Sequence, residues 1–302
     1  MAAAQDRAAV EGDDRQRAIR RAGAGAPGLA KVMGIVNRTP DSFYDKGATF
    51  TDTLALARAD EVVAQGAAIV DIGGVKAGPG DVVDAAEEID RVVPVIAAVH
   101  ERHPEVTVSV DTWRAEVAER AIAAGAGLVN DTWAGVDPEL VEVAGHHGVG
   151  YVCSHTGGAV PRTRPHRVHY DDVVADVIAE TTRLAERAVD CGVPEDKVLL
   201  DPTHDFGKNT FHGLELLRRI DEVVATGWPV LMALSNKDFI GETCARPVGG
   251  RVAGTLAATA WAAAHGVAAF RVHEVGETVD VIRMTAAIAG TAGPLDTIRG
   301  LA

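Results

Sequence analysis

The sequence of 302 residues has few aromatic residues, few cysteines and no long apolar run. Aromatic residues make up only 4% of the chain, so a buried core has to be built mainly from aliphatic side chains. The three cysteines, Cys153, Cys191 and Cys244, show no metal-ligand spacing and are too few to hold a chain of this size together by disulfides, which favours a cytoplasmic location. Neither a run of about 18 apolar residues for a membrane-spanning helix nor the apolar core of a signal peptide is present.

Basic residues are also in the minority, with 29 Lys and Arg against 43 Asp and Glu. The resulting net charge of −14 argues against nucleic acid or an anionic membrane as the main partner, because both are bound through a basic surface. We therefore expect any site for an anionic ligand to be local.

What is present is a repeated βα pattern. Residues 1–28 are a mixture of Ala, Arg, Gly and Asp in irregular order, and we expect them to form a flexible tail ahead of a folded domain at residues 29–302. From Lys31 onward, short aliphatic runs alternate with Gly- or Pro-containing loops and Ala-rich stretches of helical length. The predicted strands are residues 32–36, 68–72, 106–110, 127–129, 150–153, 198–200, 230–233 and 269–272. The predicted helices are residues 52–64, 82–102, 114–124, 138–146, 170–191, 214–226, 251–265 and 275–288.

The eight βα units favour one α/β domain, a closed (β/α)8 TIM barrel. Continuous apolar runs are typical of strands that are buried on both faces, and an open doubly wound sheet remains the alternative. Two helices carry start signals: Asp52 or Thr53 is expected to cap the first, and Asp137 followed by Pro138 supplies a cap and a first-turn proline to the fourth.

A polar residue follows or ends nearly every predicted strand. In a (β/α)8 barrel these positions converge on one face, where the active sites of this fold are built. A polar residue at one strand end is ordinary loop capping, but eight in succession favour a site. The residues are Asn37, Asp71, Asp111, Asn130, His155, Asp201, Ser235, and Arg271 with His273.

These residues lie in short phrases that resemble one protein family. The phrases are Asn37-Arg38-Thr39-Pro40-Asp41-Ser42-Phe43, Asp71-Ile72-Gly73-Gly74, Ser109-Val110-Asp111-Thr112, Asn130-Asp131, Asp201-Pro202 with Phe206-Gly207-Lys208, Ser235 with Lys237, and Arg271-Val272-His273. In this order they resemble dihydropteroate synthase, a pterin-binding TIM barrel of the folate pathway, over roughly residues 31–290. The resemblance implies transfer of the pterinylmethyl group of 6-hydroxymethyl-7,8-dihydropterin diphosphate to p-aminobenzoate, with release of pyrophosphate and with magnesium as cofactor.

The resemblance also implies a pterin site formed by Asp111, Asn130, Asp201 and Lys237. A pterin edge is a fixed row of hydrogen-bond donors and acceptors, and buried carboxylate and amide groups pair with such an edge directionally. Such groups also reject wrong rings, because leaving them unpaired is costly.

On the diphosphate side the resemblance places Asn37, Arg271 and His273, and Asn37 is also the expected magnesium ligand. A planar guanidinium suits phosphate oxygens and stabilises charge on departing pyrophosphate. Asp111, Lys237, Arg271 and His273 are therefore the expected catalytic residues.

The sequence departs from the family mainly on the side of the second substrate. Where the family continues Glu-Ser-Thr-Arg-Pro-Gly after the second strand, this chain reads Val75-Lys76-Ala77-Gly78-Pro79-Gly80, so Thr and Arg are replaced by Ala77 and Gly78. The family's Ser-Arg-Lys is Ser235-Asn236-Lys237, and two family glycines are Thr203 and Asp205. Lys76, Ala77, Gly78 and Asn236 therefore form an altered second-substrate region.

From these departures we expect a homologue that binds the pterin diphosphate but condenses it weakly or not at all with p-aminobenzoate, resembling the family's divergent, inactive second paralogue. One alternative is a fully active synthase in which Lys76 and Arg38 replace the missing Arg. Another is a barrel with a more anionic second substrate, suggested by Arg38, Lys46, Lys76, Arg162, Arg164, His166, Arg167 and His169 on the strand-end loops. A non-enzymatic pterin-binding or interaction subunit is a further alternative.

Metal-dependent hydrolysis is the reading with the least support. His155, His204, Asp205 and the pair His146-His147 are residue types that bind divalent cations. However, the pair ends a predicted helix, where histidines are common near the helix dipole. By resemblance we also expect a homodimer, with the Ala-rich final helices, residues 256–264 and 284–288, as candidate surfaces.

Overall fold

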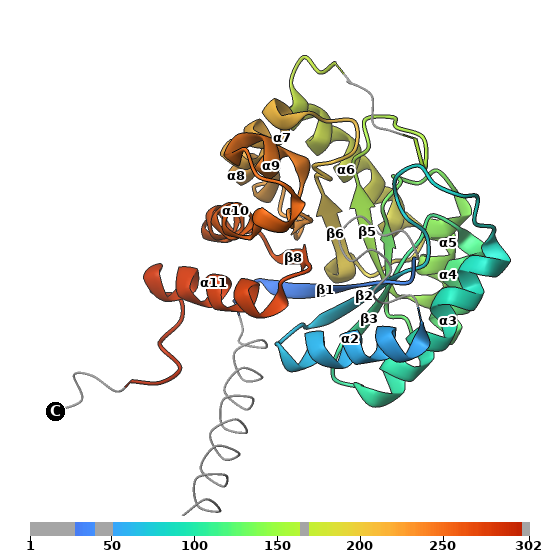
Figure 1. Cartoon of the computed structure of the whole chain (residues 1–302). Helices are drawn as coiled ribbons and strands as arrows, with labels where there is room; N and C mark the ends of the chain where they lie inside the picture. Colours follow the sequence, from blue (N-terminus) through green and yellow to red (C-terminus); the bar gives the residue numbers. More distant parts are fainter. Residues whose placement is uncertain (1–27, 40–50, 164–168, 298–302) are drawn as a thin grey trace, which may run out of the picture.

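The computed structural model describes residues 28–39, 51–163 and 169–297 (Figure 1). The predicted tail therefore lies outside the described residues apart from Gly28, as do Pro40, Asp41, Ser42, Phe43 and Lys46 of the first strand-end loop.

Eight parallel strands form the sheet, in the order β6-β5-β4-β3-β2-β1-β8-β7. The two ends of this order meet through a parallel bridge between Leu200 and Val230 and a hydrogen bond from Leu200 N to Pro229 O of 2.9 Å, so the sheet closes into the predicted barrel. The strands are β1 (Lys31–Asn37), β2 (Ile69–Gly73), β3 (Thr107–Asp111), β4 (Leu128–Asp131), β5 (Gly150–Ser154), β6 (Val198–Asp201), β7 (Leu231–Met232) and β8 (Ala269–Val272).

Helices cover the outside of the strands (Figure 1). They are α2 (Asp52–Ala64), α3 (Ala85–Arg102), α4 (Ala115–Ala123), α5 (Glu139–His147), α6 (Val173–Asp190), α7 (Thr210–Arg218), α8 (Ile220–Val224), α9 (Asp238–Cys244), α10 (Val252–Ala264) and α11 (Val275–Ile288), with short 3₁₀ segments at Glu195–Lys197 and Val248–Gly250. None of the helices in the described ranges combines the length and apolar character that a membrane crossing requires.

Three local predictions were wrong. The first helix is capped by Thr51, whose side chain accepts a hydrogen bond from Leu54 N, rather than by Asp52 or Thr53. The stretch predicted as one helix at residues 214–226 is two, α7 and α8, because a capping box at Asn209 starts the first helix early and the backbone leaves helical geometry at Arg219. Helix α9 was not predicted. By contrast, Asp137 Oδ1 accepts from Glu139 N at the start of α5, as expected.

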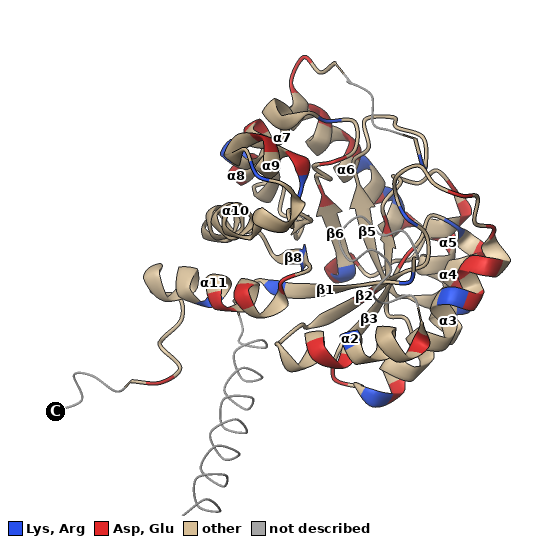
Figure 2. Ribbon diagram, viewed as in Figure 1, with Lys and Arg blue, Asp and Glu red and all other residues tan. Residues whose placement is uncertain are grey.

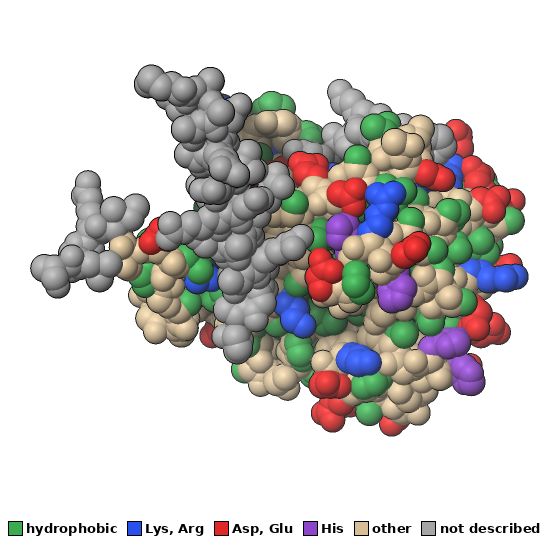
Figure 3. Space-filling model, turned by 90° about the horizontal axis from the view of Figure 1, so that it is seen from below, with side chains coloured by type: hydrophobic (Ala, Val, Ile, Leu, Met, Phe, Trp, Pro, Cys, Tyr) green, Lys and Arg blue, Asp and Glu red, His purple; other side chains and the backbone are tan. Residues whose placement is uncertain are grey.

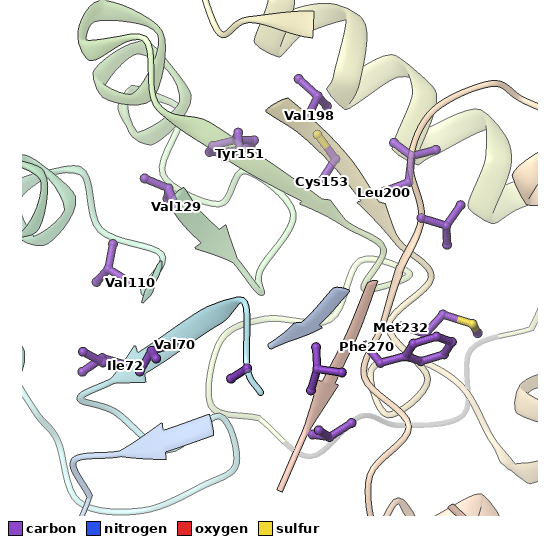
Figure 4. Close-up of a cluster of buried hydrophobic side chains, with 14 of the residues drawn as sticks. Val70, Ile72, Val110, Val129, Tyr151, Cys153, Val198, Leu200, Met232 and Phe270 are labelled. Atoms are coloured by element: carbon purple, nitrogen blue, oxygen red, sulfur yellow. The ribbon is translucent and has the colours of Figure 1, made fainter. Parts of the chain in front are cut away.

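The core consists mainly of aliphatic side chains, as the low aromatic content requires, with a few buried aromatic residues such as Trp133 and Phe270. Figure 4 shows one cluster, in which side chains such as Val70, Val110 and Leu200 come from β2, β3 and β6. These residues belong to the large cluster between the strands and the surrounding helices, whereas alternate strand residues form a smaller buried cluster of Met33, Ile69, Leu128, Val152, Leu231 and Ala269. Because side chains alternate along a strand, this second cluster fills the amino half of the barrel interior.

The amino ends of the strands border a cavity of about 1070 Å³ on the opposite side from the polar strand ends. Its walls are mostly backbone and aliphatic groups, including Ile69, Leu128 and Ala269. Figure 3 views the molecule from below and shows basic side chains interspersed with acidic ones over the part that grey atoms leave visible. In this fold the amino face serves stability rather than chemistry, so the candidate site lies at the carboxyl ends.

Candidate functional site

The upper half of the barrel interior is polar. Two residues along from four of the six members of the inner apolar cluster (Ile69, Leu128, Val152 and Ala269), and therefore on the same face of the strand, stands a polar side chain. These residues are Asp71 on β2, Asn130 on β4, Ser154 on β5 and Arg271 on β8, with Ser109 and Asp111 on β3 and Asp201 on β6. The strand pattern thus collects three carboxylates and one guanidinium in one layer.

Arg271 joins two of these carboxylates. Its Nε donates to Asp71 Oδ2 at 2.6 Å and its Nη2 donates to Asp111 Oδ2 at 2.7 Å. Burial lowers the pKa of Arg271, but Asp71 and Asp111 outweigh this and hold it above its ordinary value. Burial raises the pKa of Asp111, while Arg271 opposes the rise by favouring the ionised carboxylate. The three residues form one charge cluster in which two carboxylates share a single guanidinium.

Asn130 offers an acceptor that the protein itself does not use. Its Nδ2 donates to Asp71 Oδ2 at 3.2 Å, whereas its Oδ1 is buried without a hydrogen-bond partner. The reverse amide orientation would place an oxygen against the Asp71 carboxylate, so this orientation is fixed by Asp71. A buried acceptor without a donor is uncommon in folded proteins and points to a ligand donor.

Asp201 lies beside the same layer at the end of β6. Its Oδ1 accepts from Thr203 N at 2.8 Å, and within the described residues no hydrogen bond is formed by Oδ2. Burial raises the pKa of Asp201, and the Thr203 bond and the charges of Lys237 and Lys208 oppose this. Asn130 on β4 and Asp201 on β6, two strands separated by β5, therefore provide two directional hydrogen-bonding groups.

Comparisons with known proteins agree with this geometry. The family model described as "Pterin binding enzyme" matches residues 33–273. The chain belongs to the pterin-binding enzyme family. It is 61% identical over 275 residues to "Inactive dihydropteroate synthase 2" of Mycobacterium leprae, covering 90% of this chain and 94% of that protein.

It is also 37% identical over 262 residues to the dihydropteroate synthase of Streptococcus pyogenes, covering 84% and 94% of the two chains. The solved dihydropteroate synthase of Xanthomonas albilineans with 4-aminobenzoic acid matches with a TM-score of 0.79 and 38% identity, over 87% of this chain and 94% of that one. The predicted resemblance and fold are confirmed, and this pterin-binding enzyme homologue is a relative of dihydropteroate synthases.

Lys237, the fourth residue of the expected pterin site, is already paired. Its Nζ lies 2.6 Å from Asp205 Oδ2, and the two side chains are 23% and 36% exposed. Lys237 is the residue just before α9, and Asp205 lies in the loop between β6 and α7. The ion pair therefore links two strand-end loops of this pterin-binding barrel.

On the expected diphosphate side, His273 follows β8 and contacts Ser235 Oγ through Nδ1 at 2.9 Å. Burial lowers the pKa of His273 well below its ordinary value, and Glu274 opposes this, so the ring is neutral near pH 7. Asn37 is the last residue of β1 and is half-buried. With Arg271 in the polar layer, these residues stand at the ends of the adjacent strands β1 and β8.

Asn236, expected near the second substrate, is fully buried. Its Nδ2 donates to Glu274 Oε1 at 2.8 Å and its backbone N donates to Thr255 Oγ1 at 3.1 Å. The backbone at Asn236 is left-handed, with φ 58°, a conformation that asparagine adopts more readily than most residues. The structure thus places this side chain inside the protein, against α10 and the β8 end.

The loop after β2 carries the other altered positions. Lys76, Ala77 and Gly78 are half-buried, and the Lys76 Cε lies 3.8 Å from where a Cβ on Gly78 would be. Arg38 is buried, with its Nε donating to Arg91 O at 2.8 Å and its Nη2 donating to Asp52 Oδ1 at 2.5 Å. The Arg38 guanidinium is therefore committed to α2 and α3.

The other basic residues are less informative. Arg164, His166 and Arg167, like Lys46, lie outside the described residues. The side chain of His169 is 93% exposed and lies 3.7 Å from Asp171.

Histidines near the site either have hydrogen-bonding partners at their ring nitrogens or lie in apolar surroundings. His155 Nε2 contacts Asp176 at 2.7 Å, and Lys208 Nζ donates to its Nδ1 at 2.7 Å. Burial lowers the pKa of His155 to about 4. Among the described residues no group of three or more His, Cys, Asp or Glu is arranged to hold a metal ion. The hydrolase hypothesis therefore has no ligand set in this part of the chain.

His204 gives the first testable prediction. It is 4% exposed, packs on Phe239 with ring centroids 5.3 Å apart, and neither ring nitrogen forms a hydrogen bond. Burial, helped by Lys208 and Lys237, lowers the pKa of His204 to about 3; an interaction with the Gly213 backbone opposes this without reaching hydrogen-bond geometry. Below pH 6.5 the unfolded chain binds the proton and the folded chain does not, so this histidine destabilises the fold as pH falls.

We expect His204→Met to be more stable than wild type, with an advantage that grows by about 2 kcal/mol between about pH 7.5 and pH 5. Urea unfolding at both pH values measures this difference. His204→Gln is the control, because it removes the titration but keeps a buried polar group; it should share the pH effect and lack the gain at neutral pH. Identical pH slopes for wild type and both variants would contradict the prediction.

Sequence reasoning missed several residues of this site. Asp71 was noted as a strand-end carboxylate without a role, although it binds Arg271, Asn130 and Ser109 Oγ, the last at 2.6 Å. Glu274, which binds Ser235 and Asn236, was not singled out. The signal that could have identified Asp71 and Ser109 is the alternation of side chains along a strand, because both lie on the strand face that points into the barrel, as the predicted site residues do.

Proposed function

We propose that this chain binds 6-hydroxymethyl-7,8-dihydropterin diphosphate at the carboxyl ends of the strands and condenses it weakly or not at all with p-aminobenzoate. The unpaired Oδ1 of Asn130 is the observation that carries the pterin part, because the amino and ring N–H groups of a pterin edge are the donors that such an acceptor needs. The 4-aminobenzoic acid complex of the Xanthomonas albilineans relative supports the substrate class.

The proposal that condensation with p-aminobenzoate is impaired rests on side chains that this chain lacks. Ala77 and Gly78 supply no hydrogen-bonding side chain, and the Asn236 amide is directed to Glu274. A missing charge-assisted bond to a buried anion costs about 1.5–3 kcal/mol. The name of the 61% identical Mycobacterium leprae relative, an inactive synthase, supports the same conclusion.

In the reaction itself, the protein side chains would bind, orient and compensate charge. Arg271 would move from its carboxylate partners toward the leaving pyrophosphate, where a planar guanidinium stabilises developing negative charge. The neutral His273 would act as a hydrogen-bonding group near the same oxygens. Asp111, Asn130 and Asp201 would fix the pterin ring, and Lys237 would contribute while it remains paired with Asp205.

Magnesium fits this site only if the protein and the substrate together supply its ligands. A cage made by protein carboxylates is absent from the described residues, whereas Asn37 supplies one amide oxygen at the end of β1. Magnesium commonly takes few protein ligands and completes its shell with substrate phosphate oxygens and water. We propose that Asn37 helps to hold a magnesium ion that would neutralise diphosphate charge, and an Asn37→Ala variant whose diphosphate affinity no longer depends on magnesium would support this.

The test measures binding and turnover separately. Purified full-length protein with both substrates and magnesium should release pyrophosphate no faster than a heat-inactivated control, while calorimetry detects binding of the pterin diphosphate. Robust turnover would overturn the proposal that condensation is impaired. Absence of pterin binding would overturn the proposal that the chain binds the pterin diphosphate.

We expect Asn130→Ala to weaken pterin affinity about 10- to 100-fold, because a buried pair is lost. The matched control is Thr259→Val on α10, which also removes a buried oxygen without a partner, but on an outer helix. Calorimetric titration should show wild-type affinity for this control. Equal losses of pterin affinity in the two variants would show that Asn130 does not bind the pterin.

A fully active synthase is the second candidate, and one observation favours it. Lys76 lies close to the open space at Gly78 and brings a positive charge to the position where the family carries Arg. A flexible point charge does not reproduce bidentate geometry, so we rank this candidate second.

We also propose a homodimer in the cytoplasm. Figure 2 shows α10 without charged residues, and Trp261, Met284 and Ile288 on α10 and α11 are about half or more exposed. An apolar surface of this kind is typical of an interface between copies. All three cysteines are free thiols, as a reducing compartment favours. Sedimentation equilibrium of wild type and Trp261→Asp tests the dimer.

A further inference from the structure

Asp205 forms an ion pair with Lys237, with Asp205 Oδ2 2.6 Å from Lys237 Nζ. The pair bridges the loop after β6 and the loop after β7, which flank the expected ligand site. Both side chains are partly exposed, so the pair meets whatever enters the site from solvent.

The loop that carries Asp205 is held firmly in place. Thr203 adopts a left-handed backbone, with φ 49°, and donates through Oγ1 to Asp201 O at 3.0 Å. Lys208 Nζ donates to Thr203 O at 3.1 Å and to Phe206 O at 3.2 Å, on either side of Asp205. The carboxylate is thus positioned before any ligand arrives, which reduces the entropic cost of the ion pair.

The positive charge of Lys237 is compensated, so the Asp205–Lys237 pair contributes no net positive charge to the site. Asp205 compensates Lys237 directly, and Asp238, the next residue, is paired with Arg251 at 2.8 Å. Lys208 is surrounded by oxygen and nitrogen acceptors. A negatively charged substituent brought to this rim would meet the carboxylate of Asp205 and an ammonium group that is already paired, rather than a single unpaired ammonium group.

We propose that Asp205 determines specificity for the second substrate, by disfavouring arylamines with a negatively charged substituent and favouring uncharged ones. This inference rests on the proposed function, because it assumes a second substrate between these two loops. Asp205 acts through Lys237: it keeps the ammonium group engaged and adds its own negative charge at the rim.

A pair of isosteric probes tests this inference. p-Aminobenzoate and p-aminobenzamide have nearly the same shape and differ in charge, so a purely structural effect of a substitution alters both affinities together. Each probe is titrated by calorimetry into full-length protein saturated with 6-hydroxymethylpterin. Saturation itself reports pterin binding, so failure of the proposed function is seen as a missing pterin signal, independent of the probes.

We expect wild type to bind the amide more tightly than the carboxylate. Asp205→Asn should shift this ratio about tenfold toward the carboxylate, with the amide affinity nearly unchanged, because one unit charge is removed at close range. Asp205→Glu, which keeps the charge, should retain the wild-type preference, and Asp221→Asn, an exposed acid on α8, should leave the ratio unchanged. The same factor for both probes, an unchanged ratio in Asp205→Asn, or no binding of either probe to wild type and Asp205→Asn would overturn the inference.

Discussion

Replacing Arg271 by Gln should destabilise the protein by about 3–5 kcal/mol at neutral pH, because it leaves the buried carboxylate of Asp71 and the mostly buried carboxylate of Asp111 without their cation. Asp71 is completely buried and keeps only Ser109 and Asn130 as hydrogen-bond donors, and Asp111 keeps Thr132 at 3.2 Å. Urea unfolding at constant pH measures the loss. We also expect pterin diphosphate binding to disappear in calorimetry.

The pH dependence of this variant identifies the cause. Burial already raises the pKa of Asp111, and removal of Arg271 takes away the charge that opposes the rise. A group whose pKa is raised in the folded state stabilises the fold at low pH and loses that contribution as pH increases. The deficit of Arg271→Gln should therefore be smaller at about pH 5.5 than at about pH 8.

Two further variants control this experiment. Asp111→Asn combined with Arg271→Gln removes one of the uncompensated charges and should recover part of the lost stability, which a simple packing defect would not allow. Arg271→Lys keeps a charge but reaches only one carboxylate well, so it should lie between wild type and Gln. An unchanged urea midpoint in Arg271→Gln would show that the cluster contributes little to the fold.

The second large effect concerns activity. Ala77→Thr with Gly78→Arg restores the family residues in the loop after β2. A Cβ at Gly78 would have Lys76 Cε at 3.8 Å as its neighbour, so the larger side chain fits without a backbone clash. A charge-assisted bond restored in the transition state should increase the rate of pyrophosphate release by about 10- to 100-fold.

A coupled assay for pyrophosphate, with both substrates and magnesium, measures this gain. The control is Ala77→Thr with Gly78→Gln, which has a polar side chain of comparable reach but no charge and should remain near the wild-type rate. If the Arg variant also stays at the wild-type rate, the deficit lies elsewhere, and the Asp205–Lys237 ion pair is the next position to change.

Local sequence patterns predicted the existence of all eight strands and the bounds of several elements. β8 occupies the residues predicted for it, and α2 and α11 have the predicted bounds. β7 shrank to two residues and α9 was missed, because a seven-residue helix is too short for apolar periodicity to stand out. The Thr51 cap was missed by one residue, which is the usual uncertainty of helix ends.

The sequence predicted which residues converge at the site, but it did not predict the contacts that these residues make with one another. Parallel strands bring their carboxyl ends together, so Asp111, Asn130, Asp201 and Arg271 were expected to converge, and the polar layer collects them. The contact between Arg271 and Asp71 joins residues 200 positions apart, and no local pattern specifies it. In the same way, the resemblance located Asn236 in the altered region, while its burial against Glu274 depends on a left-handed backbone that only the three-dimensional structure shows.

The closure of the barrel bears on how such a protein diverges. β6 and β7 meet through a single bridge, and β7 pairs with β8 over only two residue pairs, whereas β1 to β5 are joined by three to five pairs each. Residues expected to hold the pterin ring stand mainly on the extensively paired strands, and the loop of Asn236 and Lys237 leaves from the sparsely paired one. Substitutions after β7 therefore disturb few backbone contacts of the sheet. In a barrel joined in this way, the loop after β7 can change its residues while the extensively paired strands keep their register.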